Sequence, residues 1–267
     1  MNTIKKDFYP KKFATRTLAL FTMLLSLYII VSILAYSGLI PLWTAVILNS
    51  LLSYGLFTPL HEACHENISA SIKKFKLIEN LIGYISGYTL LAPFSVLKLQ
   101  HLRHHSKTNQ VGKDPDLFMS SSNVFIAIIK LPIIYLVAYY NIFKQGAYKK
   151  RDIFITSNIM NIIFVTSFII LSSKFGYIYP LMIWVLPALG GLAILSMVFA
   201  WIPHHPHKQT DKYKNTRIIK GRILNYLMLG QNYHLIHHLY PKIPYYDYKR
   251  AFEVDESFLI SMKADIT

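Results

Sequence analysis

Four long apolar segments without a single charged residue constrain the fold of this chain more than any other feature. They are Leu18–Ser37, Leu42–Leu60, Ile153–Ser172 and Leu181–Ile202. Each has about 20 residues, which is the length that an α-helix needs to cross the hydrocarbon layer of a membrane. Uncharged runs of this length are rare in soluble folds. The sequence therefore predicts an all-α integral membrane protein with about four transmembrane helices.

Basic residues predict the orientation of these helices. The N-terminal segment 1–17 is rich in Lys and Arg, so the positive-inside rule places it in the cytoplasm. Two crossings then return the chain to the cytoplasm, where the basic residues between the second and third spans should also lie. Two further apolar stretches, Leu81–Leu97 and Val124–Phe143, must then enter and leave on that side, as interfacial or re-entrant helices. Two last crossings place the C-terminus in the cytoplasm as well.

Composition narrows the class further. The formal net charge is +15, and 53% of the residues are hydrophobic. Lys and Arg alternate with apolar runs, which indicates contact with a membrane surface rather than with nucleic acid. The only cysteine is Cys64, so the chain alone cannot build a disulfide or an iron–sulfur cluster. No repeat or linker divides the chain, so we interpret residues 1–267 as one domain. We expect this domain to lie in a bacterial inner (cell) membrane.

The histidines suggest a metal centre. The chain has eleven, and all of them fall in four short clusters. In a helix, residues i, i+3 and i+4 share one face, whereas adjacent residues diverge by about 100°. Nine or more imidazoles exceed the four ligands of a tetrahedral zinc ion, which suggests two metals under a histidine-rich cytoplasmic cap. The clusters are HEACH (His61, His65), HLRHH (His101, His104, His105), HHPH (His204, His205, His207) and HLIHH (His234, His237, His238).

Two interpretations from other functional classes remain open at this point. HEACH fits the zinc-protease pattern His-Glu-x-x-His, with Glu62 as the general base, although it leaves nine histidines unexplained. A non-catalytic membrane protein that binds metal is the other alternative. Imidazole suits zinc, copper, iron and nickel, and a redox reaction beside lipid favours iron among them.

The histidine boxes also carry a resemblance. HEACH, HLRHH and HLIHH resemble the HxxxH, HxxHH and HxxHH boxes of the membrane fatty acid desaturase and hydroxylase superfamily, over about residues 40 to 250. The run HHSKTNQVGKDPD is similar to the tail of the family's second box. The segment LMLGQNYHLIHHLYPKIPYYDY, the cluster WIPHHPH and the short spacing of HEACH are most similar to the bacterial β-carotene hydroxylase branch.

The resemblance implies a non-haem di-iron oxidoreductase that uses O2 on an apolar lipid. Hydroxylation of a carotenoid ring is the expected reaction, with fatty acyl desaturation or hydroxylation as the alternative. A separate donor, namely ferredoxin, rubredoxin or cytochrome b5, would supply the electrons. The implied iron ligands are His61, His65, His101, His104, His105, His204, His207, His234, His237 and His238.

Residues around the boxes are candidates for supporting roles. Metal-bound imidazoles usually donate their other N–H to a carboxylate or carbonyl oxygen. Arg103 and Lys107 could attract an acidic electron donor or face lipid headgroups. Five tyrosines crowd the last box and could line a substrate tunnel, but anchoring at the membrane interface, where Tyr is enriched, is the first expectation. The candidate partners of the imidazoles are Glu62, Asp114, Asp116 and Asn232, and the tyrosines are Tyr233, Tyr240, Tyr245, Tyr246 and Tyr248.

Overall fold

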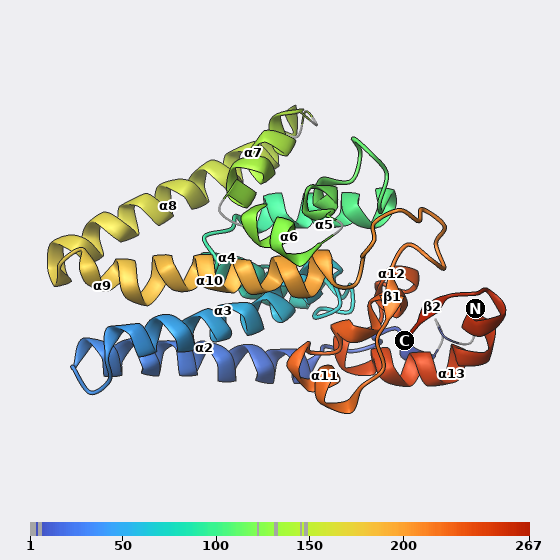
Figure 1. Ribbon diagram of the computed structural model, residues 1–267. Helices are drawn as coiled ribbons and strands as arrows, with labels where there is room; N and C mark the ends of the chain where they lie inside the picture. Colours follow the sequence, from blue (N-terminus) through green and yellow to red (C-terminus); the bar gives the residue numbers. More distant parts are fainter. Residues whose placement is uncertain (1–3, 5–6, 122, 131–132, 145, 147–148) are drawn as a thin grey trace.

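Four long helices form the stem of the protein. The computed structural model describes residues 4, 7–121, 123–130, 133–144, 146 and 149–267 (Figure 1). Lys5 and Lys6 of the basic N-terminal segment, and Pro132 of the stretch Val124–Phe143, lie outside these residues. The long helices confirm the four predicted spans and make the chain an all-α integral membrane protein. They are α2 (Thr15–Tyr36), α3 (Leu42–Cys64), α8 (Arg151–Phe175) and the continuous run Ile178–Trp201, made of α9 (Ile178–Pro180), η5 (Leu181–Val185), α10 (Leu186–Leu195) and η6 (Ser196–Trp201).

Helices α3 and α10 are the inner pair of the stem. Within an 18-residue apolar window of each span, 44% of the residues of α3 and 39% of those of the Ile178–Trp201 run are buried, against 11% for α2 and 17% for α8. A Cβ atom on Gly190 would lie 2.3 Å from Ser50 Oγ, so small residues allow the two backbones to approach closely. The outer helices expose Ile33 and Ile162, which are 57% and 64% accessible. Lipid chains would cover such apolar surface, which soluble proteins seldom expose over long stretches.

The segment predicted to be re-entrant is a broken pair of helices. Helices α4 (Lys76–Thr89), which follows η1 (Lys73–Phe75), and α5 (Phe94–Lys107) meet at a bend of 98°. The chain folds back so tightly there that a Cβ atom on Gly87 would lie 2.5 Å from the carbonyl oxygen of Ala92. The bend fits a segment that enters and leaves at one membrane face.

The second ambiguous stretch contains two short helices, α6 (Val124–Lys130) and α7 (Ile134–Lys144), after η2 (Pro115–Met119). They have 7 and 11 residues, whereas a span needs about 20. Phe125 and Ile129 of α6 are exposed. These helices therefore have the length and apolar surface that an interfacial position requires.

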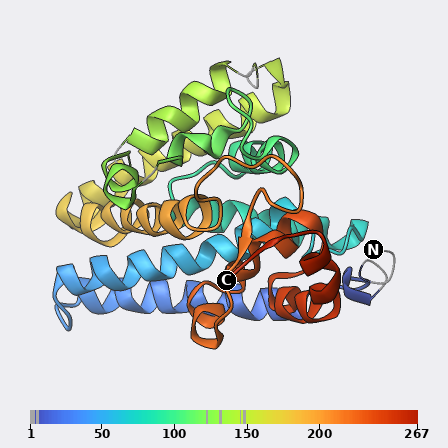
Figure 2. The same ribbon diagram turned by 45° about the vertical axis from the view of Figure 1, so that its right-hand side comes forward.

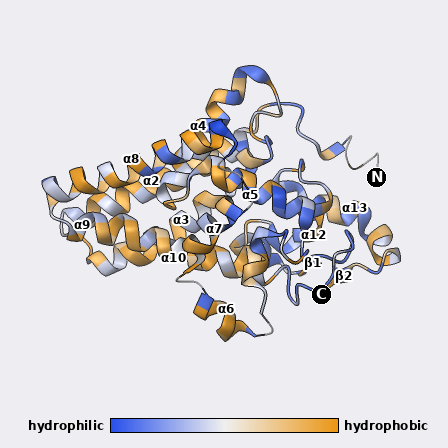
Figure 3. Ribbon diagram, turned by 90° about the horizontal axis from the view of Figure 1, so that it is seen from above, coloured by the Kyte–Doolittle hydropathy of each residue, from blue (hydrophilic) through white to orange (hydrophobic). Residues whose placement is uncertain are grey.

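The remaining chain folds into a compact cap at one end of the stem (Figure 2). Figure 3 shows apolar residues along the stem and more hydrophilic ones in the cap. Helix α13 buries residues at helical spacing, among them Tyr248, Phe252 and Leu259, and packs on Leu235 and Ile236 of α12. The cap contains β1 (Arg217–Ile218) paired in parallel with β2 (Asp265–Ile266), α11 (Arg222–Leu227), η7 (Gln231–Tyr233), α12 (His234–Leu239), η8 (Tyr245–Asp247) and α13 (Tyr248–Ser261).

Candidate metal centre

Nine of the ten predicted ligands meet in two groups where the stem joins the cap. Within each group, the nitrogens that could bind an ion all lie within 4.8 Å of one another. All four histidine clusters contribute, which confirms that the topology brings them to the same end of the membrane helices. The first histidine group consists of His61, His65, His101, His105 and His237, and the second of His104, His204, His234 and His238.

Helices α5 and α12 each contribute histidines to both groups. On α5, His101 and His105 are four residues apart and join the first group, whereas adjacent His104 joins the second. On α12, His237 joins the first group, whereas His234 and His238 join the second. The divergence of adjacent side chains, about 100° on a helix, therefore separates the groups as the sequence predicts.

The ring nitrogens within each group point at a shared position. His101 Nε2 lies 2.7 Å from His65 Nε2 and 3.0 Å from His105 Nε2. In the second group, His234 Nε2 lies 3.1 Å from His204 Nε2 and 3.2 Å from His238 Nε2. One ring nitrogen has a single in-plane lone pair or a single N–H, so it cannot form a hydrogen bond to two such neighbours. Convergent lone pairs around a cation explain this arrangement, and the residues thus fit two metal ions.

The opposite ring nitrogens are held by hydrogen bonds. His104 Nδ1 lies 2.8 Å from Asp114 Oδ1, as the sequence predicted for that carboxylate. His234 Nδ1 lies 3.0 Å from Gln231 Oε1, and His237 Nδ1 lies 2.9 Å from the Tyr248 hydroxyl. Such contacts fix the tautomer that leaves Nε2 free to bind a metal. Thr108 Oγ1 makes a similar contact, 3.3 Å from His238 Nδ1.

The sequence analysis missed Gln231, Tyr248 and Thr108. Tyr248 was expected to anchor the last box at the membrane interface, and that prediction is wrong for it, for Tyr240 and for Tyr233. All three side chains are buried in the cap, and the Tyr240 hydroxyl donates to Asp255 Oδ2 at 2.8 Å. The available signal was the spacing of α13, which turns Tyr248 inward with Phe252.

The other predicted supporting residues have mixed outcomes. Glu62 is fully buried, with Oε1 3.7 Å from His61 Nδ1, and Asp116 Oδ2 lies 3.6 Å from His104 Nδ1. Both are near the ligands but beyond hydrogen-bond distance. The prediction for Asn232 is wrong within the described residues, because its side chain donates to the carbonyl oxygen of Ile219 at 2.8 Å. The supporting amide belongs to its neighbour, Gln231.

The cluster HHPH after the fourth span contributes one histidine to the two groups. His204 belongs to the second histidine group, whereas His205 packs on Trp201 with ring centroids 4.9 Å apart. The predicted ligand His207 lies outside both groups, with its ring centroid 6.0 Å from that of His204. The helix ends at Trp201, so helical spacing no longer holds residues 204 and 207 on one face.

Electrostatics favour neutral imidazoles at most positions. Burial, together with the neighbouring histidines, lowers the pKa of His237 and of His238 well below the ordinary range. Neutral imidazole is the form that binds a metal. At His104, burial lowers the pKa, but the carboxylates of Asp116 and Asp114 more than offset this effect, so its pKa is raised. These carboxylates therefore favour positive charge beside the second histidine group.

We expect Tyr248→Phe to lower iron affinity about tenfold, because loss of such a supporting contact typically costs 10- to 100-fold. The variant keeps the buried ring and removes only the oxygen 2.9 Å from His237 Nδ1. Iron retention during titration with a chelator would measure the effect. Tyr233→Phe is the matched control, since Tyr233 is equally part of the buried cap core. Equal iron retention in both variants would contradict the role assigned to Tyr248.

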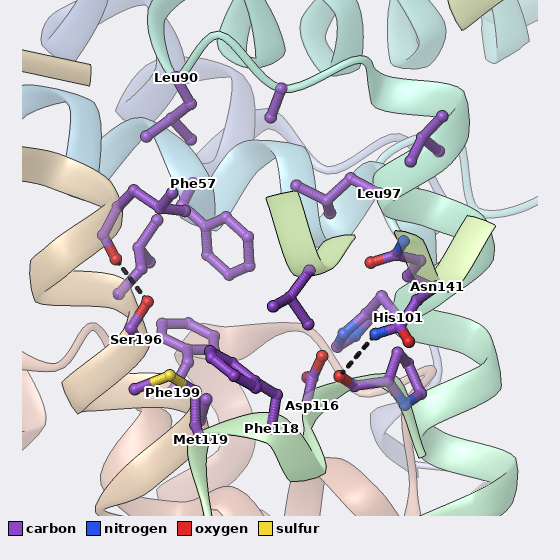
Figure 4. A pocket seen from close by; sticks show the side chains of 18 of the residues that line it. Phe57, Leu90, Leu97, His101, Asp116, Phe118, Met119, Asn141, Ser196 and Phe199 are labelled. Carbon is purple, nitrogen blue, oxygen red and sulfur yellow. Dashed lines mark hydrogen bonds between the residues drawn. The ribbon is translucent and has the colours of Figure 1, made fainter. Parts of the chain in front are cut away.

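An apolar cavity of about 190 Å³ reaches the first histidine group. Its lining comes from α3, from the α4–α5 bend, from η2 and α7, and from the run Ile178–Trp201. Figure 4 shows Phe57, Phe199 and Leu97 around the space, with His101 and Asp116 toward one side. An apolar molecule could therefore reach the metal centre within the membrane-embedded part of the protein.

This geometry disfavours the zinc-protease interpretation. A catalytic zinc site has three protein ligands and one open position, whereas His61 and His65 share their group with three further imidazoles. Glu62 lies in a fully buried position and accepts a hydrogen bond from Asn67 Nδ2 at 3.3 Å. The carboxylate therefore does not face an open, water-filled position, as a general base for hydrolysis would.

Comparisons with known proteins agree with this site. The profile of the fatty acid desaturase family matches residues 10–262. A chloroplastic omega-6 fatty acid desaturase of Arabidopsis thaliana is 26% identical over 80% of this chain and 53% of its own length. The sn-1 oleoyl-lipid 12-desaturase of Picosynechococcus sp. is 21% identical over 94% of this chain and 80% of its own length.

A third relative has the word ferredoxin in its name. The sn-1 acyl-lipid omega-3 desaturase (ferredoxin) of Synechocystis sp. is 22% identical over 80% of this chain and 67% of its own length. The chain spans only about half the length of the chloroplastic relatives, as the 53% coverage of the Arabidopsis protein illustrates.

Proposed function

The chain belongs to the fatty acid desaturase family, and we propose that it is an O2-dependent di-iron oxidoreductase that desaturates the acyl chains of membrane lipids. The observation that carries this proposal is the contact between the apolar cavity and the first histidine group, since His101 belongs to both. A lipid chain could reach the metals from the bilayer without crossing water.

The relatives favour acyl desaturation over the carotenoid-ring hydroxylation that the sequence analysis placed first. The three relatives described above act, by their names, on fatty acids or acyl lipids. The apolar lining of the cavity suits an acyl chain. Acyl desaturation, the alternative in the sequence analysis, thus becomes the proposed activity.

The residues of the chain have separable roles in this reaction. Two iron ions held by the histidine groups would activate O2 and break unactivated C–H bonds. Desaturation breaks two C–H bonds and forms one C=C bond, while O2 and two electrons from a donor, with two protons, give two water molecules. Phe57, Leu195 and Phe199 line the cavity and would hold the acyl chain and exclude water. Asp114, Gln231 and Tyr248 would orient the imidazoles.

The donor and the membrane orientation are part of the proposal. A ferredoxin-type protein would supply the electrons, since the Synechocystis relative carries that donor in its name. We also propose that the histidine groups lie on the cytoplasmic side of a bacterial inner (cell) membrane, and the positive-inside rule, applied to the basic segments, supports the cytoplasmic side.

Mass spectrometry of total lipid extracts tests this function. Cells that express the chain with ferredoxin and its reductase should contain acyl chains that have lost two hydrogens. Cells that express His104→Ala should lack them. In cells that also make β-carotene, a carotenoid that gains oxygen, with unchanged acyl chains, would refute acyl desaturation in favour of the carotenoid alternative.

A further inference from the structure

A second cavity, of about 160 Å³, opens beside the second histidine group. The segment between η6 and β1 forms most of it, with Asn109 from the loop after α5 and with Lys263 and Asp265 from the C-terminus. In Figure 1 this segment extends from the end of the stem past α5 and α12. We call this cavity the polar cleft.

The polar cleft reaches the metal centre. His204 belongs both to the second histidine group and to the cleft lining, and His207 stacks beside it with an interplanar angle of 18°. The apolar cavity contacts the first group instead, through His101. The two cavities therefore approach different sides of the metal centre.

The lining of the polar cleft suits water and charge rather than lipid. His207 Nε2, Asn215 Oδ1 and Thr216 Oγ1 are buried and have no hydrogen-bond partner among the described residues. Buried polar atoms normally find a partner, so ordered water would fill this space. Among the residues described between 203 and 217, no large apolar side chain is strongly exposed.

The rim of the polar cleft carries unbalanced positive charge. Three exposed lysines, Lys208, Lys214 and Lys263, line the cleft. Within the described part of the chain, no acidic group lies within ion-pair distance of Lys208, Lys214 or Lys263. The carboxylate of Asp265, which also lines the cleft, lies 3.6 Å from Arg217 Nε and is thereby neutralised.

We propose that Lys208, Lys214 and Lys263 form the docking surface for a small acidic electron carrier, and that His207 and His204 connect this surface to the second histidine group. This inference rests on the proposed function, in which each desaturation consumes two electrons from a donor. Complementary charge steers such partners and sets their orientation.

The other basic patches fit this role less well. Arg103, which the sequence analysis considered for the donor, has its Nε donating to the carbonyl oxygen of Lys113 at 3.0 Å. Lys76 and Lys98 are both paired with Glu66. Helix α11 exposes Ile223 and Tyr226, as expected of a segment that faces lipid. The rim of the polar cleft combines free charge with a path to the metals.

Binding to a redox-inactive partner tests the docking surface without turnover. The probe is a plant-type ferredoxin whose iron is replaced by gallium, titrated onto the iron-loaded protein in phosphatidylcholine nanodiscs. In the variant that combines Lys208→Glu, Lys214→Glu and Lys263→Glu, we expect Kd to rise about tenfold or more at low salt. The difference should vanish near 1 M salt, where the Debye length is about 3 Å.

A matched variant makes the result specific. The variant that combines Lys73→Glu, Lys74→Glu and Lys249→Glu has the same change in net charge at exposed positions away from the polar cleft. We expect its Kd to stay near the wild-type value. With native ferredoxin, the cleft variant should raise the KM for ferredoxin and leave kcat at saturating ferredoxin unchanged, since none of the three lysines contacts the histidine groups.

Three outcomes would overturn the docking surface. The first is equal weakening by both variants, which would indicate a general charge effect. The second is a wild-type Kd in the cleft variant, and the third is no binding by the wild-type protein; both are expected if the rim only neutralises lipid headgroups. Because binding is measured without substrate, each of these results would leave the proposal of acyl desaturation standing.

Discussion

His104→Ala and His237→Ala are each expected to abolish desaturation, with product falling at least about 100-fold. Loss of a supporting partner of a ligand already costs 10- to 100-fold, so loss of the ligand itself should cost more. His104 belongs to the second histidine group and His237 to the first, so each variant removes one imidazole from a different group. Iron content by elemental analysis, with product by mass spectrometry, measures the effect.

The matched control is His205→Ala. His205 lies between His204 and Pro206, but its ring packs on Trp201, outside both groups. We expect this variant to keep about two irons per chain and wild-type activity. All three variants should still insert into the membrane, because none of the substitutions lies in the apolar centre of a span. Full activity in His104→Ala or His237→Ala would contradict the ligand assignment.

The sequence was sufficient for the parts of this site that depend on periodicity. Uncharged runs of about 20 residues predict the spans, and histidines at i, i+3 and i+4 predict shared helical faces. The same rule predicts that the adjacent side chains of His104 and His105 diverge, and they do lie in different histidine groups. Asp114 was also predictable as a candidate, since metal-bound imidazoles usually donate to a carboxylate or carbonyl oxygen, and the loop between His104 and Asp114 turns back at Asn109 and Gly112.

The predictions that failed concern residues whose positions depend on packing between distant segments. Tyr248 meets His237 because α13 folds back on α12, which separation in sequence does not reveal. Asn232 and Gln231 are adjacent amides, and only the backbone of η7 decides which one faces His234. His207 follows the end of the helix, so the periodic rule that holds for the histidines of HEACH, HLRHH and HLIHH does not apply to it.

Substrate preference was also predicted less well, because it depends on packing between distant segments. The spacing of HEACH favoured the carotenoid branch, although this spacing describes only the metal ligands. The cavity that would receive the substrate is lined by five separate segments of the chain, and none of the histidine boxes specifies its shape. Residues of the cavity wall, rather than the ligands, therefore offer the sharper test of the acyl proposal.

Ser196→Phe is expected to reduce desaturation of long acyl chains at least about tenfold, as filling a hydrophobic pocket by even one methylene can cost 10- to 200-fold. Ser196 is 3% exposed and lines the apolar cavity with Phe57 and Leu90. Its Oγ donates only to the carbonyl oxygen of Leu192 in its own helix, at 2.8 Å (Figure 4). A benzyl side chain at this position would therefore displace substrate rather than break a tertiary hydrogen bond.

Iron content separates this effect from damage to the metal centre. Ser196→Phe should keep about two irons per chain, and its remaining activity should shift toward shorter acyl chains, which need less of the cavity. Ser173→Phe is the matched control, since Ser173 is exposed on α8 and its Oγ also donates to its own helix, at 2.9 Å to Ile170. Unchanged activity of Ser196→Phe on long chains would show that the acyl chain reaches the metals by another path, because a filled cavity cannot admit it.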